Sequence, residues 1–284
     1  MIFAPQGQDF QWSFSNVTAT RPVTTGRGSV ITPGTAPTFG AWVEVASAAN
    51  MTQETYGILL CFNNGATAAA IRNILVNIGV DNAGGTAYEV RIPTLIAGSA
   101  STFGLGGGGI WYYFPLYIPA GSSVAVQATG TLTTAFNAYV QFFGQPRRPE
   151  TLRVGSYVTS FGIDLANARG TAVTLGTTAE GAYTQLGATT TRSHWWWQSC
   201  YYAADTTMAL QVIFSDLAAG NATVKKILYE NQYTSVTAAE QIANMPVFVN
   251  AYNNVAVGEN IYIRGQTSGT PDTGTGFAAY GLGG

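Results

Sequence analysis

The amino-acid sequence predicts an all-β protein made of two tandem, duplicated antiparallel β-sandwich domains of jelly-roll-like topology, with an N-terminal arm. Three observations carry this prediction. The 284 residues include 34 glycines, and only 9% are charged, against about 25% in ordinary globular proteins. Apolar residues recur at every second position in short runs that stop at turn residues, which is typical of strands. The second half of the chain also repeats the first.

The repeat consists of five matches in the same order, which is hard to obtain by chance even in a chain rich in Thr, Ala and Gly. They align residues 27–32 with 169–174, 40–45 with 181–186, 56–62 with 195–201, 81–85 with 216–220, and 121–127 with 258–264. The third match places Cys61 on Cys200, and the fourth places Asp81 on Asp216 as turn residues. We therefore expect an arm at residues 1–26, copy one at 27–146 and copy two at 147–284. The proline-containing segment 145–150, whose charged side chains favour solvent, joins the copies.

The arm is expected to form a strand, because Phe10, Trp12 and Phe14 alternate with polar residues. Such an edge strand docks either on its own domain or on another subunit. Further strands are expected where apolar residues alternate, and their inward rows include Ile110, Tyr112 and Phe114. These strands cover residues 74–80, 88–92, 110–118 and 124–126 in copy one, and 210–214, 247–249, 255–257 and 261–263 in copy two. One short helix is expected at residues 236–244, with Ser235 as its N-cap.

Motifs for catalysis, metals or cofactors are sparse, so we expect no enzyme, metal site or cofactor. His194 is the only histidine and lies beside three tryptophans, which suits packing better than a catalytic triad. The glycine run at residues 104–109 precedes a strand rather than a helix, unlike a phosphate loop. The two cysteines, placed on equivalent strands of separate cores, are expected to be buried free thiols.

The charge balance argues against nucleic acid as a partner, because 12 basic and 14 acidic residues leave a net charge of -2. The sequence has no run of 18 apolar residues for a membrane-spanning helix, and it starts without a secretory signal pattern. We therefore expect a protein made in a bacterial or similarly reducing cytoplasm.

Aromatic side chains on the outward faces of strands carry the remaining functional signal. Alternation places Trp196, Gln198 and Tyr202 on one face with His194, and it turns Trp111, Tyr113 and Tyr117 outward in copy one. Exposed Trp and Tyr beside amides suit a subunit interface, packing under a loop, or sugar stacking. The predicted assembly interface comprises Phe10, Trp12, Trp111 and Tyr113. The predicted glycan or host contact comprises Trp196, Gln198 and Tyr202 on a copy two that projects outward, so that copy one alone would suffice for assembly.

These features, with strand-turn phrases such as residues 116–123 (LYIPAGSS), resemble virion surface proteins of tailed bacteriophages or gene transfer agents. The resemblance implies a non-enzymatic structural protein of the virion, placed on the head or in the tail or fibre. It also implies a homo-oligomer that contacts other virion proteins and possible host glycans. The alternative is a carbohydrate-binding module that binds glycans through exposed Trp and Tyr. A depolymerase is the third alternative, and it requires two acids facing each other across a cleft.

Overall fold

The computed structural model describes residues 9–14, 28–63, 73–97, 110–144, 153–187, 190–202, 212–234, 241–243, 254–269 and 276–284. In these ranges the ordered elements are β-strands, and all but one of the strand pairs are antiparallel, so the all-β prediction is confirmed. Copy one contains β1 (Asp9–Phe14), β2 (Ser29–Ile31), β3 (Gly34–Thr35), β4 (Val43–Ala46), β5 (Thr55–Asn63), β6 (Ile74–Asp81), β7 (Glu89–Ile96), β8 (Ile110–Phe114), β9 (Ser123–Gly130) and β10 (Phe136–Gly144). Copy two contains β11 (Tyr157–Phe161), β12 (Ile163–Asp164), β13 (Arg169–Ala172), β14 (Thr184–Gln185), β15 (Trp196–Tyr202), β16 (Val212–Gly220), β17 (Lys225–Thr234), β18 (Gln241–Ala243), β19 (Asn260–Thr267) and β20 (Gly276–Gly283).

The two copies have the same strand order. In copy one, sheet A runs β1-β10-β5-β8 with β2 also on β10, and sheet B runs β4-β9-β6-β7 with β3 also on β9. In copy two, sheet C runs β11-β20-β15-β18 with β13 also on β20 and β12 on β13, and sheet D runs β14-β19-β16-β17. Apart from hairpins such as β6-β7 and β16-β17, neighbouring strands in each sheet are far apart along the chain, in the arrangement of a double-sheet jelly roll. The predicted tandem jelly rolls are confirmed.

Strand register confirms the alignment of residues 56–62 with 195–201. Cys61 pairs with Tyr139 across β5 and β10, and Cys200 pairs with Ala278 across β15 and β20 in the same position. The turns before β9 and β19 also match, because Gly121 and Gly258 both have a positive φ there. Both cysteines are buried free thiols, as predicted.

Two local predictions are wrong. Asp216 lies within β16 opposite Arg264, whereas Asp81 ends β6, so these two residues are not equivalent turn residues. The predicted helix at residues 236–244 is overturned by β18, because Gln241–Ala243 pair with β15. Pairing at the sheet edge outweighs the helix propensity of this short segment.

The predicted arm contributes its described part to copy one itself. β1 pairs with β10 from Asp9 opposite Gly144 to Phe14 opposite Val140, and β11 pairs with β20 in the same way in copy two. β1 is thus a regular strand of the first jelly roll. Of the two docking modes left open by the sequence, the structure has the one on its own domain.

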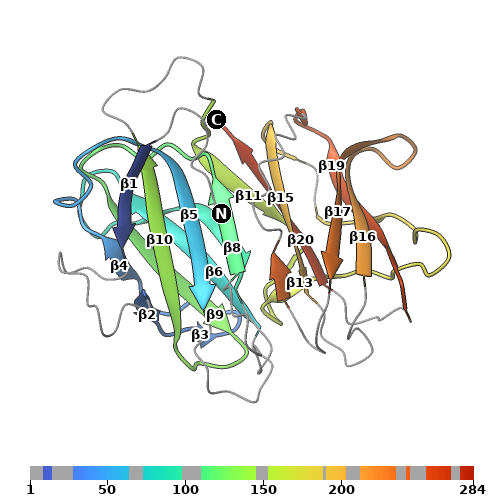
Figure 1. Cartoon of the computed structure of the whole chain (residues 1–284), viewed down its shortest axis with the longest axis horizontal. Helices are drawn as coiled ribbons and strands as arrows, with labels where there is room; N and C mark the ends of the chain where they lie inside the picture. The colour runs from blue at the N-terminus through green and yellow to red at the C-terminus, as the bar shows by residue number, and fades with distance from the viewer. Residues whose placement is uncertain are drawn as a thin grey trace.

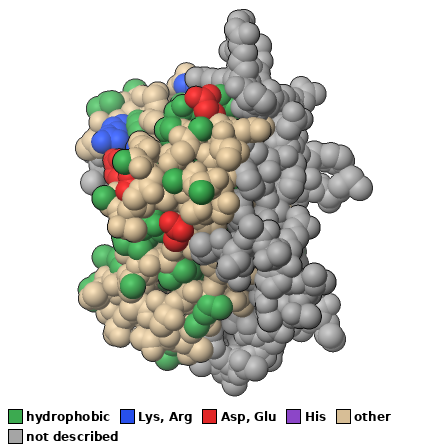
Figure 2. Space-filling model, turned by 90° about the vertical axis from the view of Figure 1, so that its left-hand side faces the viewer, with side chains coloured by type: hydrophobic (Ala, Val, Ile, Leu, Met, Phe, Trp, Pro, Cys, Tyr) green, Lys and Arg blue, Asp and Glu red, His purple; other side chains and the backbone are tan. Residues whose placement is uncertain are grey.

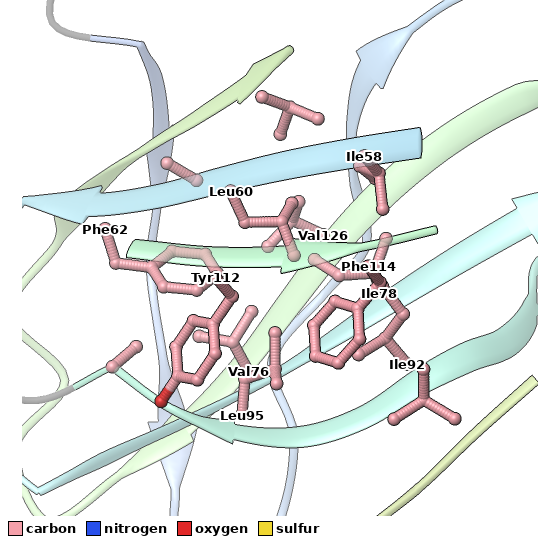
Figure 3. Close-up of a cluster of buried hydrophobic side chains, with 14 of the residues drawn as sticks. Ile58, Leu60, Phe62, Val76, Ile78, Ile92, Leu95, Tyr112, Phe114 and Val126 are labelled. Atoms are coloured by element: carbon pink, nitrogen blue, oxygen red, sulfur yellow. The ribbon is translucent and has the colours of Figure 1, made fainter. Parts of the chain in front are cut away.

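The core of copy one lies between sheets A and B. Alternate residues of β5, Ile58, Leu60 and Phe62, point toward Val76 and Ile78 of β6 (Figure 3). The inward row predicted for residues 110–118 is confirmed, because its members are buried in the same cluster. These members are Ile110, Tyr112, Phe114, Leu116 and Ile118.

Sheet C lies between two hydrophobic cores. In Figure 1, β11, β15 and β20 lie between the strands of copy one on the left and β16, β17 and β19 on the right. Phe277 and Ala279 of β20 face the core of copy two, while Ala278 and Tyr280 belong to the hydrophobic cluster of copy one. All eight residues of β20 are buried. The outer face of copy two therefore closes the side of copy one formed by β7 and β8.

Copy two contacts copy one at a bulge in β7. The register of β6 and β7 shifts opposite Asn77, Thr94 has a φ of 49°, and Asn77 Oδ1 accepts a hydrogen bond from Thr94 N at 2.8 Å. The Tyr280 hydroxyl donates to Thr94 O at 3.3 Å and accepts from Ile96 N at 2.9 Å. The hydroxyls of Thr94 and Ser160 lie 2.6 Å apart. Copy two thus satisfies edge backbone groups that burial removes from water.

Replacing Tyr280 by Phe is expected to lower the free energy of unfolding by about 1–3 kcal/mol, because a buried Ile96 N–H loses its acceptor. Denaturant unfolding of the whole chain measures this. The matched control is Tyr157→Phe, which removes an exposed hydroxyl that donates to Ser193 O, and its effect is expected to stay within about 0.5 kcal/mol. Equal effects of the two variants would contradict a special role of the Tyr280 hydroxyl.

Candidate functional site

The residues predicted as outward aromatic contacts lie in the interface between the two sandwiches. Trp196 is 7% exposed, Gln198 5% and Tyr113 2%. The ring of Trp196 packs edge-on against Tyr113, with centroids 6.3 Å apart, and Tyr113 in turn packs against Phe143. The predicted exposure of Trp196 and Gln198 for a glycan, and of Tyr113 for a neighbouring subunit, is therefore wrong. Alternation correctly separates the two faces of β15, but both faces are buried.

The other predicted contact residues are only partly described. Trp111 lies on β8 and is half-buried against the core of copy one. Phe10 and Trp12 lie on β1 and Tyr202 lies on β15, but their side chains lie outside the described residues. Their contacts stay predictions. The expectation that copy one suffices without copy two is not supported, because copy two covers buried residues of β7 and β8 such as Ile96 and Tyr112.

Cys200 lies beside two tyrosines, Tyr112 and Tyr280, at the centre of the interface. Tyr112 and Tyr280 pack edge to face, with ring centroids 5.5 Å apart, and the Tyr112 hydroxyl donates to Ile96 O at 2.6 Å. Burial raises the pKa of the Cys200 thiol to about 12, so the thiol stays protonated near neutral pH. A protonated thiol in this position packs as a small apolar group rather than as a nucleophile.

His194 is held among aromatic rings just before β15. Its Nε2 shares a hydrogen bond of 2.9 Å with the Thr159 hydroxyl, and its ring lies 5.6 Å from Phe161 and 5.4 Å from Trp197. Burial, reinforced by the charge of Arg192, lowers the pKa of His194 to about 4. The ring is therefore neutral at neutral pH and joins β11 to the start of β15.

A surface that the sequence analysis did not single out lies on the outer face of sheet B. The benzene ring of Trp42 fills the space above Gly79, where a side chain would have no room, and lies 5.4 Å from the ring of Tyr88. The Tyr88 hydroxyl donates to Glu44 at 3.4 Å. Burial, and then the charge of Glu44, raises the pKa of Tyr88. We call Trp42, Glu44, Gly79 and Tyr88 the Trp42 patch; Trp42, Glu44 and Tyr88 are all half-buried.

The equivalent surface on sheet D carries a charged cluster. Tyr183 occupies the position of Trp42 and packs edge-on against Tyr262, with centroids 6.3 Å apart. The guanidinium of Arg264 lies 4.6 Å from the centre of the Tyr183 ring, and the Lys225 ammonium lies 4.6 Å from that of Tyr262. We call these four residues, with Glu180 and Asp216, the Tyr183 cluster. The sequence match of residues 40–45 with 181–186 could have indicated these two equivalent surfaces, because it aligns Trp42 with Tyr183, and both side chains are half-buried.

An ion pair distinguishes the Tyr183 cluster from the Trp42 patch. Arg264 donates from Nε and Nη2 to Asp216 Oδ2 at 2.9 and 2.8 Å, and Nη2 also lies 2.5 Å from Glu180. Burial, and then the hydrogen bond and charge of Asp216, raises the pKa of Glu180. The cross-strand pair at the same position in copy one is Asn77 with Gln127, which carries no charge. The two copies therefore present related aromatic positions with different electrostatics.

No group of three or more His, Cys, Asp or Glu side chains is placed to hold a metal ion within the described ranges. In the same part of the chain, no helix is long and apolar enough to cross a membrane.

Comparison with known proteins gives structural likeness but no family or sequence match. No protein-family model matches the chain, and no curated protein matches its sequence. The chain is similar to the N-terminal CBM22-1-CBM22-2 tandem domain of Xyn10C from Paenibacillus barcinonensis, with 13% identity over 99% of this chain and 98% of that one. The TM-score is 0.30, so the description of the fold rests on the strand pairing itself.

The buried His194 is expected to make the fold less stable in mild acid. Its pKa falls from about 6.5 unfolded to about 4 folded, so between these values the unfolded chain binds more protons and the free energy of unfolding falls as the pH falls. Denaturant unfolding of the wild type and of His194→Gln, measured from pH 7 to pH 4, tests this. The stability difference between the two should shrink toward pH 4, and parallel pH profiles would contradict the prediction.

Proposed function

We propose that this chain is a non-catalytic glycan-binding protein with one binding surface on the outer sheet of each jelly roll. One observation carries the proposal: both copies place a half-buried aromatic residue, Trp42 or Tyr183, at the same position on the outer face of the second sheet. Each of these rings lies beside a second aromatic ring and within a surface that contains a carboxylate. The core does not require this arrangement, because these side chains lie outside both hydrophobic clusters.

The chemistry of these surfaces suits a sugar. An aromatic ring offers a flat apolar face for the C–H groups of a pyranose, and its polar tip stays in water. Carboxylates accept strong hydrogen bonds from hydroxyl groups, and here they come from Glu44 in copy one and Glu180 in copy two. A few polar groups around an aromatic platform are typical of small-ligand sites.

The packed junction between the copies fixes the two surfaces relative to each other, which can raise the affinity for a glycan that reaches both. Because sheet C is packed into both cores, the two surfaces belong to one body rather than to two modules on a flexible linker. A glycan or glycan-coated surface that reaches both sites would gain avidity without new contacts. Uncharged side chains make up most of the coloured surface in Figure 2, and charged side chains form only small groups on it.

A second proposal is that the chain is a virion structural protein of a tailed phage-like particle. It is supported by the tight fusion of two jelly rolls and by the sparse charge, which leaves wide uncharged faces for neighbouring subunits. Jelly rolls serve both viral capsids and lectins, so this support is an analogy at the level of the fold. The two proposals are compatible, since a particle surface is where a glycan-binding domain meets a host. Immunogold electron microscopy of particles from the source is expected to label them, and unlabelled particles would remove this second proposal.

Replacing Trp42 or Tyr183 by Ala is expected to weaken glycan binding by about tenfold or more each, because an aromatic platform contributes at least about 1.4 kcal/mol. A glycan array identifies the ligand, and titration calorimetry measures the affinity of each variant. Val30→Ala is the matched control, because it removes an exposed apolar side chain outside both surfaces. Circular dichroism confirms that each variant is folded. An array without hits, or unchanged affinity of both aromatic variants, would overturn the proposal.

A further inference from the structure

The Tyr183 cluster already holds an ammonium group, which belongs to the chain itself. Lys225 Nζ lies 4.6 Å from the ring centre of Tyr262 and 5.3 Å from that of Tyr183. It also donates to Ala222 O at 2.8 Å, in the turn between β16 and β17. A cation over two aromatic rings is the arrangement by which proteins recognise ammonium ligands.

We call the rings of Tyr183 and Tyr262 the cage. The charges around the cage favour a cation. Glu180, Asp216 and Glu230 bring three carboxylates to this face; Asp216 lies opposite Glu230 in the sheet, and the charge of Glu230 contributes to the raised pKa of Glu180. Arg264 neutralises one of them through its hydrogen bonds to Asp216. Without Lys225, the group of three carboxylates and one guanidinium keeps a net negative charge. An incoming ammonium group would therefore gain both the ring faces and the field of the carboxylates.

The Trp42 patch lacks this combination. Asn77 and Gln127 stand where copy two has Asp216 and Arg264, and Ala125 stands where copy two has Tyr262. The second ring of the Trp42 patch is Tyr88, which precedes β7 rather than lying on β9, and the pair of Asn77 with Gln127 carries no charge. The difference between the copies is thus concentrated on the groups that would recognise a cation.

We propose that the Tyr183 cluster binds the ammonium group of an amino sugar, and that Lys225 occupies this position while the site is empty. The inference rests on the proposed glycan-binding function and narrows the ligand class of copy two. The pyranose ring lies against Tyr183, its ammonium group replaces the Lys225 ammonium between the two tyrosines, and its hydroxyls donate to Glu180. The Lys225 side chain has to leave this position, and its strand and turn stay in place because they are held by β16 and by Asn221. The Trp42 patch takes a neutral sugar.

Two oligosaccharides that differ only at the nitrogen test this proposal: a glucosamine tetramer, with free ammonium groups, and an N-acetylglucosamine tetramer, without them. Calorimetric titration in mildly acidic buffer of the Lys225→Ala chain is expected to show roughly threefold to tenfold tighter binding of the glucosamine tetramer than the wild type, because the internal competitor is gone. Lys226→Ala is the matched control: Lys226 is the exposed neighbour, and its loss changes the net charge equally. Its affinity should rise much less. Adding Tyr262→Ala to Lys225→Ala should remove the gain.

The outcomes separate this inference from the proposed function. Equal gains in the Lys225→Ala and Lys226→Ala variants would reduce the effect to net charge and overturn the cage. Failure of every variant to prefer glucosamine over N-acetylglucosamine, with Trp42-dependent glycan binding intact, would also overturn the cage and leave the proposed function standing. Loss of all glycan binding, including that through Trp42, would overturn both.

Discussion

Burial of strand β20 of sheet C on both faces is the constraint on which the rest of the structure depends. A β-strand directs successive side chains to opposite faces, so a strand between two cores must be apolar or hydrogen-bonded at every position. β20 meets this requirement with Phe277 and Ala279 toward copy two and with Ala278 and Tyr280 toward copy one. The one polar atom of these four side chains, the Tyr280 hydroxyl, reaches backbone groups of β7. The interface therefore resembles the interior of a domain more than a contact between two domains.

This constraint explains how the two copies have diverged. Sheet C covers the edge strand β7 at Thr94 and Ile96, through Ser160 and Tyr280. The equivalent edge strand β17 carries exposed Lys226, Glu230 and Gln232, and charged side chains on an edge discourage further strand pairing. Copy two covers copy one, and its own corresponding edge has the composition of a strand that faces water. The duplication thus produced an asymmetric pair in which each copy has a different structural task.

Because of the same asymmetry, the aromatic residues available for binding lie on the outer faces of sheets B and D. The aromatic side chains with the most conspicuous pattern in the sequence, around Trp196, are occupied in joining the copies. The equivalent aromatic residues on sheets B and D have no such task, and they differ in charge between the copies. An ion pair such as Asp216 with Arg264, whose carboxylate is buried and whose guanidinium side chain is 27% exposed, contributes little net stability, because desolvation offsets the attraction. Its presence in one copy only is easier to understand as a requirement of recognition than of folding.

Sequence periodicity and the internal repeat were sufficient for the fold class, the duplication, most strand positions and the inward row of β8, because these follow from local alternation and from comparison of the chain with itself. The helix expected at residues 236–244 failed because pairing of β18 with β15 overrode local propensity.

The predicted exposure of Trp196, Gln198 and Tyr113 failed for a different reason. Alternation shows that two faces of a strand differ, but only the tertiary structure decides whether the second face meets water or another sheet. The meeting of Tyr183, Tyr262, Lys225 and Arg264 likewise needed the sheet order, since these residues lie on two strands, β17 and β19, and on a loop before β14 that are distant along the chain.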